Sequence, residues 1–239
     1  MLFQFDFLAK IVSLFSETCR ETGLPRKLYI ALDTEAAGPE LGIHSTISIG
    51  AVVITRDLLK YRDYEERGWV FYSELKPLSY RFSAEAMKIA CSQLDCIQES
   101  WEVNPVFVTG HKDFKPDLVL KLMRKICPHP DAVMRQFYNW IQERRVEASA
   151  EEIVGVTDTV FFDSGRISLL FGQHCPFPSP FGWRGLDLTS LFKGYTGLPD
   201  ASLSELGVPD IREKPHRADH DAVYLAQMAR KLLFETLGW

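Results

Sequence analysis

Three short apolar segments in the N-terminal half of the chain predict β-strands. They cover residues 27–32, which end at Asp33, the β-branched run 46–55, and residues 69–75, where aromatic and polar positions alternate. The connections between these segments are too short to hold crossover helices. We therefore expect the three strands to form an antiparallel meander.

The rest of the chain alternates helical periodicity with single short strands. Apolar positions recur at helical spacing in four segments, residues 83–89, 132–144, 162–171 and 219–237. Ser83 is placed to cap the first of these helices, and Gly172 is placed to end the third. Short apolar runs at 153–156 and 185–188 predict two further strands. This order predicts an α/β domain of three layers, in which helices flank a mixed five-stranded sheet.

No change in composition marks a domain boundary, so we expect a single domain over residues 1–239. Residues 1–22 carry an apolar stripe at helical spacing and predict an N-terminal helix. That helix either docks on the domain or forms the face of a homodimer. Residues 90–130 are the least regularly patterned part of the chain, and we interpret them as an insertion or flap.

The charge of the chain limits how it can bind nucleic acid. With 27 Lys and Arg residues against 32 Asp and Glu residues, the formal net charge is −5. This balance argues against a protein that coats nucleic acid through a broad basic face. It is compatible with an enzyme that grips one strand end locally, and with carboxylates gathered to hold divalent cations.

The sequence shows no sign of a membrane span or a secretory signal. No run approaches the roughly 18 to 20 apolar residues that cross a bilayer, and the first residues lack a basic start and a small-residue cleavage site. Five cysteines without a CxxC motif disfavour a disulfide framework or a zinc site. We therefore expect a cytoplasmic protein with reduced thiols.

Four acidic residues and one histidine fall where an α/β sheet presents its ligand sites. Asp33 and Glu35 close the first strand two positions apart, so in extended backbone their side chains project from the same face. Asp163 begins the helix that follows a short strand, and Asp221 lies in the first turns of the last helix. His216 stands in the loop that enters this last helix.

Three sequence motifs frame these residues. Ala-Leu-Asp-Thr-Glu at 31–35 is followed by an Ile- and Gly-rich strand at 47–52, Asp-Thr-Val-Phe-Phe-Asp stands at 158–163, and His-Arg-Ala-Asp-His-Asp stands at 216–221. In this order the motifs resemble those of the DEDDh branch of the 3′–5′ exonuclease superfamily, which includes ribonuclease T, oligoribonuclease and the proofreading exonuclease subunits. The second motif matches only in part, because Asp158-Thr159 replaces a His-Asn pair that is frequent in relatives.

The resemblance implies an RNase H-like fold and a metal-dependent 3′–5′ exonuclease that uses two Mg²⁺ or Mn²⁺ ions. By this resemblance Asp33 bridges both ions, and Glu35 and Asp221 complete the ion on the nucleophile side. Asp163 supports the second ion through water. His216 accepts a proton from the attacking water, a role that suits a side chain that titrates near neutral pH. Hard divalent cations prefer carboxylate oxygens and water, so the chemistry and the residue types agree.

The same resemblance implies nucleic-acid 3′ ends as the substrate. The acidic charge and small size favour single-stranded or short nucleic acid over long duplexes, and of the two polymers we favour RNA over DNA. Five residues are predicted to contact the substrate: Leu41, His44, Phe162, Lys214 and Arg217. The first two follow the motif after which relatives bind the terminal nucleotide, Phe162 can stack on a base, and the two cations flank His216.

Each of these residues, taken alone, also has an ordinary structural interpretation. Acidic side chains in the first turn of a helix are stabilised by the helix dipole, and a loop histidine is commonly a surface residue. Five such coincidences in family order are harder to explain in this way. Two other functions stay open, a catalytically silent interaction module and a metal-dependent nucleotide phosphohydrolase. A one-nucleotide ladder from an end-labelled strand, its absence, or phosphate release from small nucleotides distinguishes the three.

Overall fold

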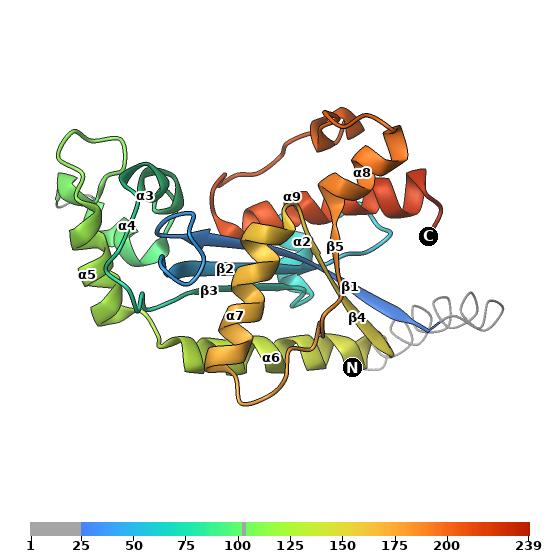
Figure 1. The fold of residues 1–239 in the computed structure, drawn as a ribbon, viewed down its shortest axis with the longest axis horizontal. Helices are drawn as coiled ribbons and strands as arrows, with labels where there is room; N and C mark the ends of the chain where they lie inside the picture. The colour runs from blue at the N-terminus through green and yellow to red at the C-terminus, as the bar shows by residue number, and fades with distance from the viewer. Residues whose placement is uncertain (1–24, 102–103) are drawn as a thin grey trace.

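A computed structural model describes residues 25–101 and 104–239 of the chain (Figure 1). The helix predicted over 1–22, with its docking or dimer face, lies outside the described residues. Among the described helices, none combines the length and the apolar character that crossing a bilayer would need.

The centre of the fold is a five-stranded mixed sheet, which confirms the predicted fold class. Its strands are β1 (Lys27–Ala36), β2 (Thr46–Val53), β3 (Val70–Glu74), β4 (Glu152–Thr157) and β5 (Gly185–Asp187), in the spatial order β3-β2-β1-β4-β5. β1, β2 and β3 pair antiparallel as the predicted meander, and β4 and β5 add to the sheet in parallel. The sheet therefore has one antiparallel half and one parallel half, which meet at β1.

β1 is longer than predicted, and the extra length carries the first motif. The parallel pairing of β1 with β4 stops at Ala31 opposite Val156. The pairing with β2 continues, with Asp33 opposite Gly50 and with Glu35 beyond it. The two acidic residues thus lie within the strand rather than after it. Because β4 no longer flanks them, this end of β1 has no strand partner on one side.

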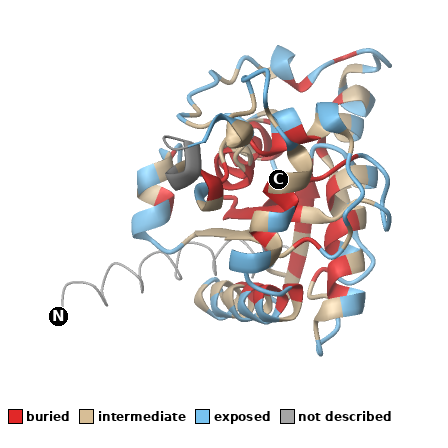
Figure 2. Ribbon diagram, turned by 90° about the vertical axis from the view of Figure 1, so that its left-hand side faces the viewer, coloured by how far each residue is buried: buried red, intermediate tan, exposed pale blue. Residues whose placement is uncertain are grey.

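Helices cover both faces of the sheet (Figure 1). α9 (Ala218–Arg230) lies along one face, while α6 (Pro130–Glu147) and α7 (Gly165–His174) pack on the other. The remaining α-helices are α2 (Tyr61–Glu66), α3 (Ala84–Ala90), α4 (Asp95–Trp101), α5 (Pro116–Ile126) and α8 (Leu188–Thr196). Short 3₁₀ turns lie at Pro105–Phe107 and Leu203–Leu206, and π-helical turns at Val160–Ser164 and Lys231–Thr236. Buried residues run through the sheet and along the inner faces of these helices (Figure 2).

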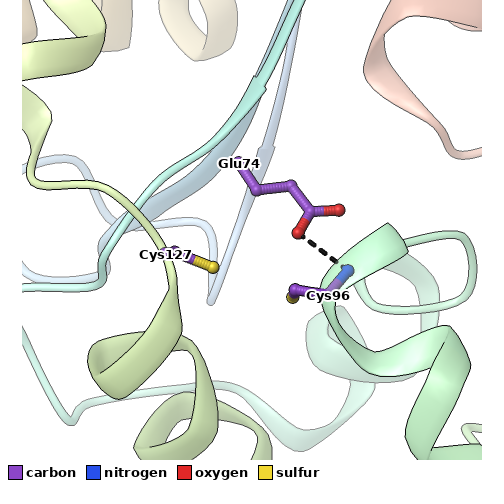
Figure 3. A group of neighbouring side chains, drawn as sticks. All are labelled: Glu74, Cys96 and Cys127. Atoms are coloured by element: carbon purple, nitrogen blue, oxygen red, sulfur yellow. Dashed lines mark hydrogen bonds between the residues drawn. The ribbon is translucent and has the colours of Figure 1, made fainter.

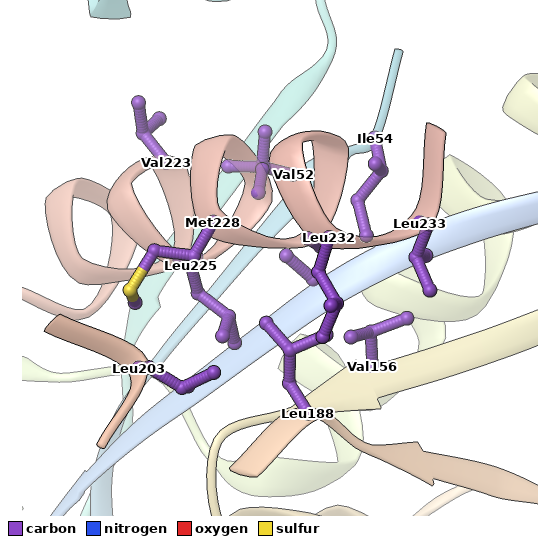
Figure 4. Packing of buried hydrophobic residues seen from close by; sticks show 14 of the residues in the cluster. Val52, Ile54, Val156, Leu188, Leu203, Val223, Leu225, Met228, Leu232 and Leu233 are labelled. Carbon is purple, nitrogen blue, oxygen red and sulfur yellow. The ribbon is translucent and has the colours of Figure 1, made fainter. Parts of the chain in front are cut away.

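Aliphatic packing fixes α9 on the sheet (Figure 4). Val52 of β2 and Val156 of β4 are fully buried against the helix, as are Leu232 and Leu233 in the turn that follows it. Burying one such side chain contributes about 1.5–3 kcal/mol to folding. This core sets the axis of α9 across β1 and β2, and so sets the position of its first turn.

Several helix boundaries differ from the prediction, and α6, predicted over 132–144, runs from Pro130 to Glu147. The helix predicted over 162–171 starts as the π-helical turn and continues through Gly172 to His174. Gly172 lacks the left-handed φ of a helix-ending glycine and has open space where a side chain would lie, so it does not end the helix. The last helix was predicted over 219–237, but its α-helical part ends at Arg230 and the chain goes on as a π-helical turn.

Residues 90–130, which have no regular pattern in the sequence, are largely helical. α4 and α5 are short, and together with α3 they enclose a hydrophobic core that is separate from the two cores on the sheet. The fully buried residues of this third core include Met87, Cys91, Ile97, Leu120 and Met123. Its helices gather beyond the carboxyl end of β1, at the left in Figure 1. The interpretation of this segment as an insertion or flap stays a prediction.

Gly50 explains why the strand after the first motif carries a glycine. A Cβ atom at this position would lie 2.1 Å from the carbonyl of Ala218 and 2.3 Å from the amide nitrogen of Asp219. The first turn of α9 therefore rests directly on the backbone of β2, in the pair that holds Asp33. Because Gly50 has no side chain, the first turn of α9, which carries Asp221, can pack close to the end of β1.

We expect Gly50→Ala to destabilise the fold by about 1–3 kcal/mol, because the added methyl group must displace backbone rather than a flexible side chain. For a chain of this size, that corresponds to a loss of roughly 2–4 °C in Tm per kcal/mol. Differential scanning calorimetry of both proteins measures it. Gly194→Ala in α8 is the matched control, since nothing lies within 4 Å of the position that its added methyl group would take, and alanine favours a helix. Equal melting temperatures for Gly50→Ala and the native chain would contradict this account of α9 docking.

Candidate active site

The structure brings the predicted acidic residues and His216 together at the carboxyl end of β1. Glu35, Asp221 and His216 each offer a ligand atom, and these three atoms lie within 4.8 Å of one another. Asp33 is close enough to Asp163, Glu35 and Asp221 for their charges to act on its carboxyl group. Four carboxylates from β1, α9 and the turn before α7 thus share one small region.

Asp163 is fixed by the backbone and side chain of Thr34. The amide of Thr34 donates to Asp163 Oδ1 at 2.9 Å, and the Thr34 hydroxyl donates to the same oxygen at 2.8 Å. The residue itself sits in the π-helical turn Val160–Ser164, whose extra width precedes the regular helix α7. Burial raises the pKa of Asp163 to about 6, although both Thr34 bonds act in the opposite direction.

Asp221 is held by groups from the loop that enters α9. Arg212 donates from Nη1 to Asp221 Oδ1 at 2.8 Å, and the backbone N–H of His216 donates to Oδ2 at 3.1 Å. His216 itself has φ of 64°, a left-handed conformation that turns the chain into the helix. Its residue is exposed to solvent, so the imidazole is free to meet a substrate beside Glu35 and Asp221.

The remainder of the third motif anchors α9 rather than joining the acidic cluster. Asp219 is fully buried and accepts hydrogen bonds from the Tyr61 hydroxyl at 2.6 Å and from Arg217 Nε at 2.8 Å. His220 stacks on the Tyr61 ring with 4.1 Å between ring centroids. The neighbouring acid and histidine therefore have structural partners, while Asp221 and His216 face the site.

The carboxylate cluster has more negative charge than the neighbouring side chains neutralise. Burial, and then the charges of Asp221 and Asp163, raise the pKa of Glu35 to about 8. Burial followed by its three acidic neighbours holds the pKa of Asp33 well above its usual range. The Arg212 guanidinium opposes the rise in the pKa of Asp33 and of Asp221, but does not cancel it. A cluster of oxygen ligands with this excess of charge fits hard divalent cations such as Mg²⁺ or Mn²⁺.

Comparison with known proteins finds one curated exonuclease that is similar over most of the chain. The chain is 28% identical over 212 residues to the 3′–5′ DNA exonuclease Cap18 of Escherichia coli, a match that covers 86% of this chain and 91% of that relative. No protein-family model matches the chain. The chain is thus similar in sequence to a 3′–5′ DNA exonuclease and in fold to a DEDDh family member.

Solved structures share the fold of this chain at low sequence identity. The nuclease domain of 3′hExo, a DEDDh family member bound to rAMP, has a TM-score of 0.59 and 14% identity, over 89% of this chain and 94% of that one. S. pombe Pop2p in its Mg²⁺- and Mn²⁺-bound form has a TM-score of 0.55 and 13% identity, over 97% of this chain and 90% of that one. At these identities the likeness establishes the fold.

The loop that follows the first motif borders two clefts. They have volumes of about 250 Å³ and 420 Å³, and the exposed side chain of Leu41 lines both. His44 lines the smaller cleft, but its ring packs on Gly38 and its Nδ1 pairs with the Glu40 carboxylate. Contacts of Leu41 and His44 with a terminal nucleotide stay predictions.

The other predicted substrate-binding residues differ in the partners that they already have within the protein. Phe162 is half-buried with the Arg166 guanidinium 4.4 Å from its ring centroid. Arg217 pairs with Asp219 and Asp95, and lies over the Tyr72 ring at 4.2 Å. To bind a phosphate, Arg217 would have to give up one of these partners. Lys214 is half-buried and its role stays a prediction.

Sequence reasoning missed Arg166, the largest fully buried side chain of the described residues. Its guanidinium donates to the carbonyl oxygens of Gly38 at 2.7 Å, Pro39 at 3.0 Å and His44 at 3.1 Å. One α7 residue thus holds the loop after the first motif beside the turn that carries Asp163. An arginine three residues after the second-motif aspartate was the available signal, but its partners are distant in sequence.

The pKa shifts predict how the stability of the metal-free protein depends on pH. Glu35, with a pKa of about 8, and Asp163, with a pKa of about 6, hold protons more tightly in the fold than in the unfolded chain. Their contribution to stability is complete below their ordinary values near 4 and is lost as pH rises through 6 and then 8. We expect the free energy of unfolding to fall over this window, as measured by urea denaturation with a chelator present.

Saturating Mg²⁺ is expected to restore most of that stability above about pH 7, because bound cations replace the protons on the carboxyl groups. Glu35→Gln is the informative comparison, since it removes one of the titrating groups of the cluster without changing the side-chain shape. An identical pH dependence in Glu35→Gln and the native chain would show that Glu35 does not titrate in this way.

Proposed function

We propose that this chain is a metal-dependent 3′–5′ exonuclease of DEDDh type that removes nucleotides from single-stranded DNA ends. One observation carries the proposal, the convergence of Asp33, Glu35, Asp163 and Asp221 beside the exposed His216. A protein that only binds nucleic acid has no use for four crowded carboxylates, which repel one another and raise their own pKa values. Metal-assisted hydrolysis of a phosphodiester gives such carboxylates a role, because they hold the divalent cations.

The four carboxylates would hold two Mg²⁺ or Mn²⁺ ions. When bound, such a pair supplies charge neutralisation for the phosphodiester and acidifies the attacking water. In this assignment Asp33 and Glu35 contribute from one face of β1, and Asp221 contributes from the first turn of α9. Asp163, oriented by Thr34, completes the set from the turn before α7.

His216 would act as the general base. Its residue is exposed and its ligand atom lies within 4.8 Å of those of Glu35 and Asp221, so the imidazole can reach a water held at the carboxylates. The backbone N–H of His216 is already committed to Asp221. One residue thus fixes a metal-binding carboxylate through its main chain and leaves its ring for proton transfer.

The choice of DNA rests on the Cap18 relative, whose name describes a DNA exonuclease. The RNA preference expected from the sequence has no support in the comparisons. The net charge of −5 still favours a local grip on one strand end over a long duplex. The proposed contacts with that end remain the same five side chains, Leu41, His44, Phe162, Lys214 and Arg217. Arg166 holds the loop that carries the first two of them.

The test is a degradation assay on 5′-labelled oligonucleotides of one sequence, as single-stranded DNA, double-stranded DNA and single-stranded RNA, with Mg²⁺ or Mn²⁺. We expect a one-nucleotide ladder that shortens from the 3′ end, fastest on single-stranded DNA. The same ladder fastest on RNA would overturn the DNA assignment only. Binding without cleavage would indicate a silent module, and phosphate release from mononucleotides alone would indicate a phosphohydrolase.

A further inference from the structure

A second group of ligand-type side chains lies outside the acidic cluster (Figure 3). Glu74, Cys96 and Cys127 come from the end of β3, from α4 and from the residue that follows α5. One carboxylate oxygen and the two sulfur atoms all lie within 4.8 Å of one another. From these residues we infer a Zn²⁺ site of Cys₂Glu type, with water as the fourth ligand, that ties the helices α4 and α5 to the sheet.

The spacing of the donor atoms suits a tetrahedral ion. Zinc binds thiolate sulfur at about 2.3 Å and carboxylate oxygen at about 2.0–2.2 Å, so two sulfurs on one ion stand about 3.8 Å apart. The observed group needs to close by no more than about 1 Å to reach that geometry. Thiolate ligands select zinc over Mg²⁺ or Mn²⁺, so this site and the carboxylate cluster would bind different metals.

Glu74 is positioned by contacts that leave its carboxylate able to bind a metal. It accepts hydrogen bonds from the Tyr72 hydroxyl at 2.9 Å and from the backbone amides of Asp95 and Cys96. The Cys96 amide is 3.1 Å from Glu74 Oε2, which fixes the start of α4 at the carboxylate (Figure 3). Carboxylate oxygens have further lone pairs, so these bonds leave room for a metal.

Cys127 is held near Glu74 by the backbone. The amide of Lys76, two residues after Glu74, donates to the carbonyl of Pro128 at 2.8 Å. This bond joins the segment after β3 to the segment after α5. Cys127 is 9% exposed and the other two residues are half-buried, so an ion here would be shielded on one side and open to water on the other.

The local charge favours the binding of a cation. The hydrogen bonds that Glu74 accepts come from neutral groups, so its charge is solvated but not balanced by them. The neighbouring Cys127 thiol, burial and the Glu74 charge all raise the pKa of Cys96. Zinc binding would release both thiol protons to solvent and would change no oxidation state.

The site has a structural consequence for the neighbouring acidic cluster. Glu74 pairs across the sheet with Ser48, and Ser48 pairs with Glu35. Two strand spacings separate the two carboxyl-bearing residues, or about 10 Å. A metal bound at Glu74 would therefore clamp α4 and α5, which belong to a separate core, beside the active-site edge of the sheet.

The test uses Co²⁺ as a probe on the full-length protein, stripped of metal and kept reduced with a phosphine. We expect one Co²⁺ per chain to give a sulfur-to-cobalt charge-transfer band in the near ultraviolet, which oxygen ligands at the acidic cluster do not produce. Zn²⁺ should abolish the band stoichiometrically and raise Tm by roughly 5 °C or more.

The variants make the assignment specific. Cys96→Ser and Cys127→Ser should lose the band, while Cys175→Ser, the matched half-buried thiol, and Asp33→Asn should retain it. Glu74→Gln should keep the band but weaken Co²⁺ binding by about tenfold or more, because the carboxylate charge is lost. Circular dichroism of the metal-free variants checks their fold.

Absence of the band in the fully reduced native chain would overturn the site, and so would its survival in Cys96→Ser. Recovery of Cys96 and Cys127 as a disulfide that phosphine reduces without any later metal uptake would also overturn it. None of these outcomes bears on the exonuclease assay, in which Mg²⁺ or Mn²⁺ acts at other residues.

Discussion

Asp33→Asn is expected to lower kcat/KM for single-stranded DNA by about 10³-fold or more. Asp33 interacts with all three of the other carboxylates, since the charge of each of them raises its pKa. Charge stabilisation of a phosphoryl transition state by divalent cations contributes several kcal/mol, and each step of about 1.36 kcal/mol is tenfold in rate. An amide in place of the shared carboxylate removes the ligand that the assignment gives to both ions.

The same substitution is expected to stabilise the metal-free protein. Burial and repulsion disfavour the charged form of Asp33, so a neutral side chain of the same shape relieves that cost. We therefore predict a higher Tm without metal and a smaller rise in Tm when Mg²⁺ is added. This combination separates loss of function from loss of folding, because a misfolded variant would melt earlier.

Asp117→Asn is the control for Asp33→Asn. Asp117 is a half-buried residue of α5 whose carboxylate pairs with Lys121 at 3.0 Å, and it lies on no element of the active site. Its activity should match that of the native chain. If Asp33→Asn retained activity within a few-fold of this control, Asp33 could not be the shared metal ligand, and the mechanism proposed above would fail.

Much of this site could be predicted from local sequence pattern. Side chains alternate between the two faces of a strand, so Asp33 and Glu35 project from the same face. This prediction does not depend on the length of β1, which runs four residues further than predicted. The placement of Asp221 and His216 around the start of α9 followed from helix periodicity after residue 218. These are short-range rules, and they succeed where tertiary contacts agree with them.

The parts that failed depend on contacts between residues distant in sequence. The extra length of β1 depends on its partner β2, and Gly172 stays helical because nothing in its surroundings forces a left-handed turn. The helices α4 and α5 are short, with few periodic positions to detect, and their core is shared with α3. Arg166 contacts carbonyl groups more than 120 residues away, and the Glu74, Cys96 and Cys127 group has ligand spacings that match no zinc motif.

His216→Asn is expected to lower kcat by about 10²–10⁴-fold, the usual contribution of a general base, while leaving metal binding intact. Asparagine is the informative replacement because it tolerates the left-handed backbone that His216 adopts at φ of 64°. The backbone N–H that supports Asp221 is then kept, and only the imidazole is lost. An alanine at this position would confound the loss of the base with strain in the loop.

The pH dependence of kcat decides between a chemical and a structural role for the His216 ring. With Mg²⁺ kept saturating at every pH, so that protons do not displace it from the carboxylates, protonation of a general base reduces kcat at acidic pH in the native chain, and that limb should vanish in His216→Asn. The rise in Tm on adding Mg²⁺ should be unchanged, and His111→Asn, a substitution of an exposed histidine beside Asp113, should leave the profile untouched. Retention of the acidic limb in His216→Asn would mean that another group accepts the proton, and the exposed imidazole would then contribute through substrate binding, visible in KM.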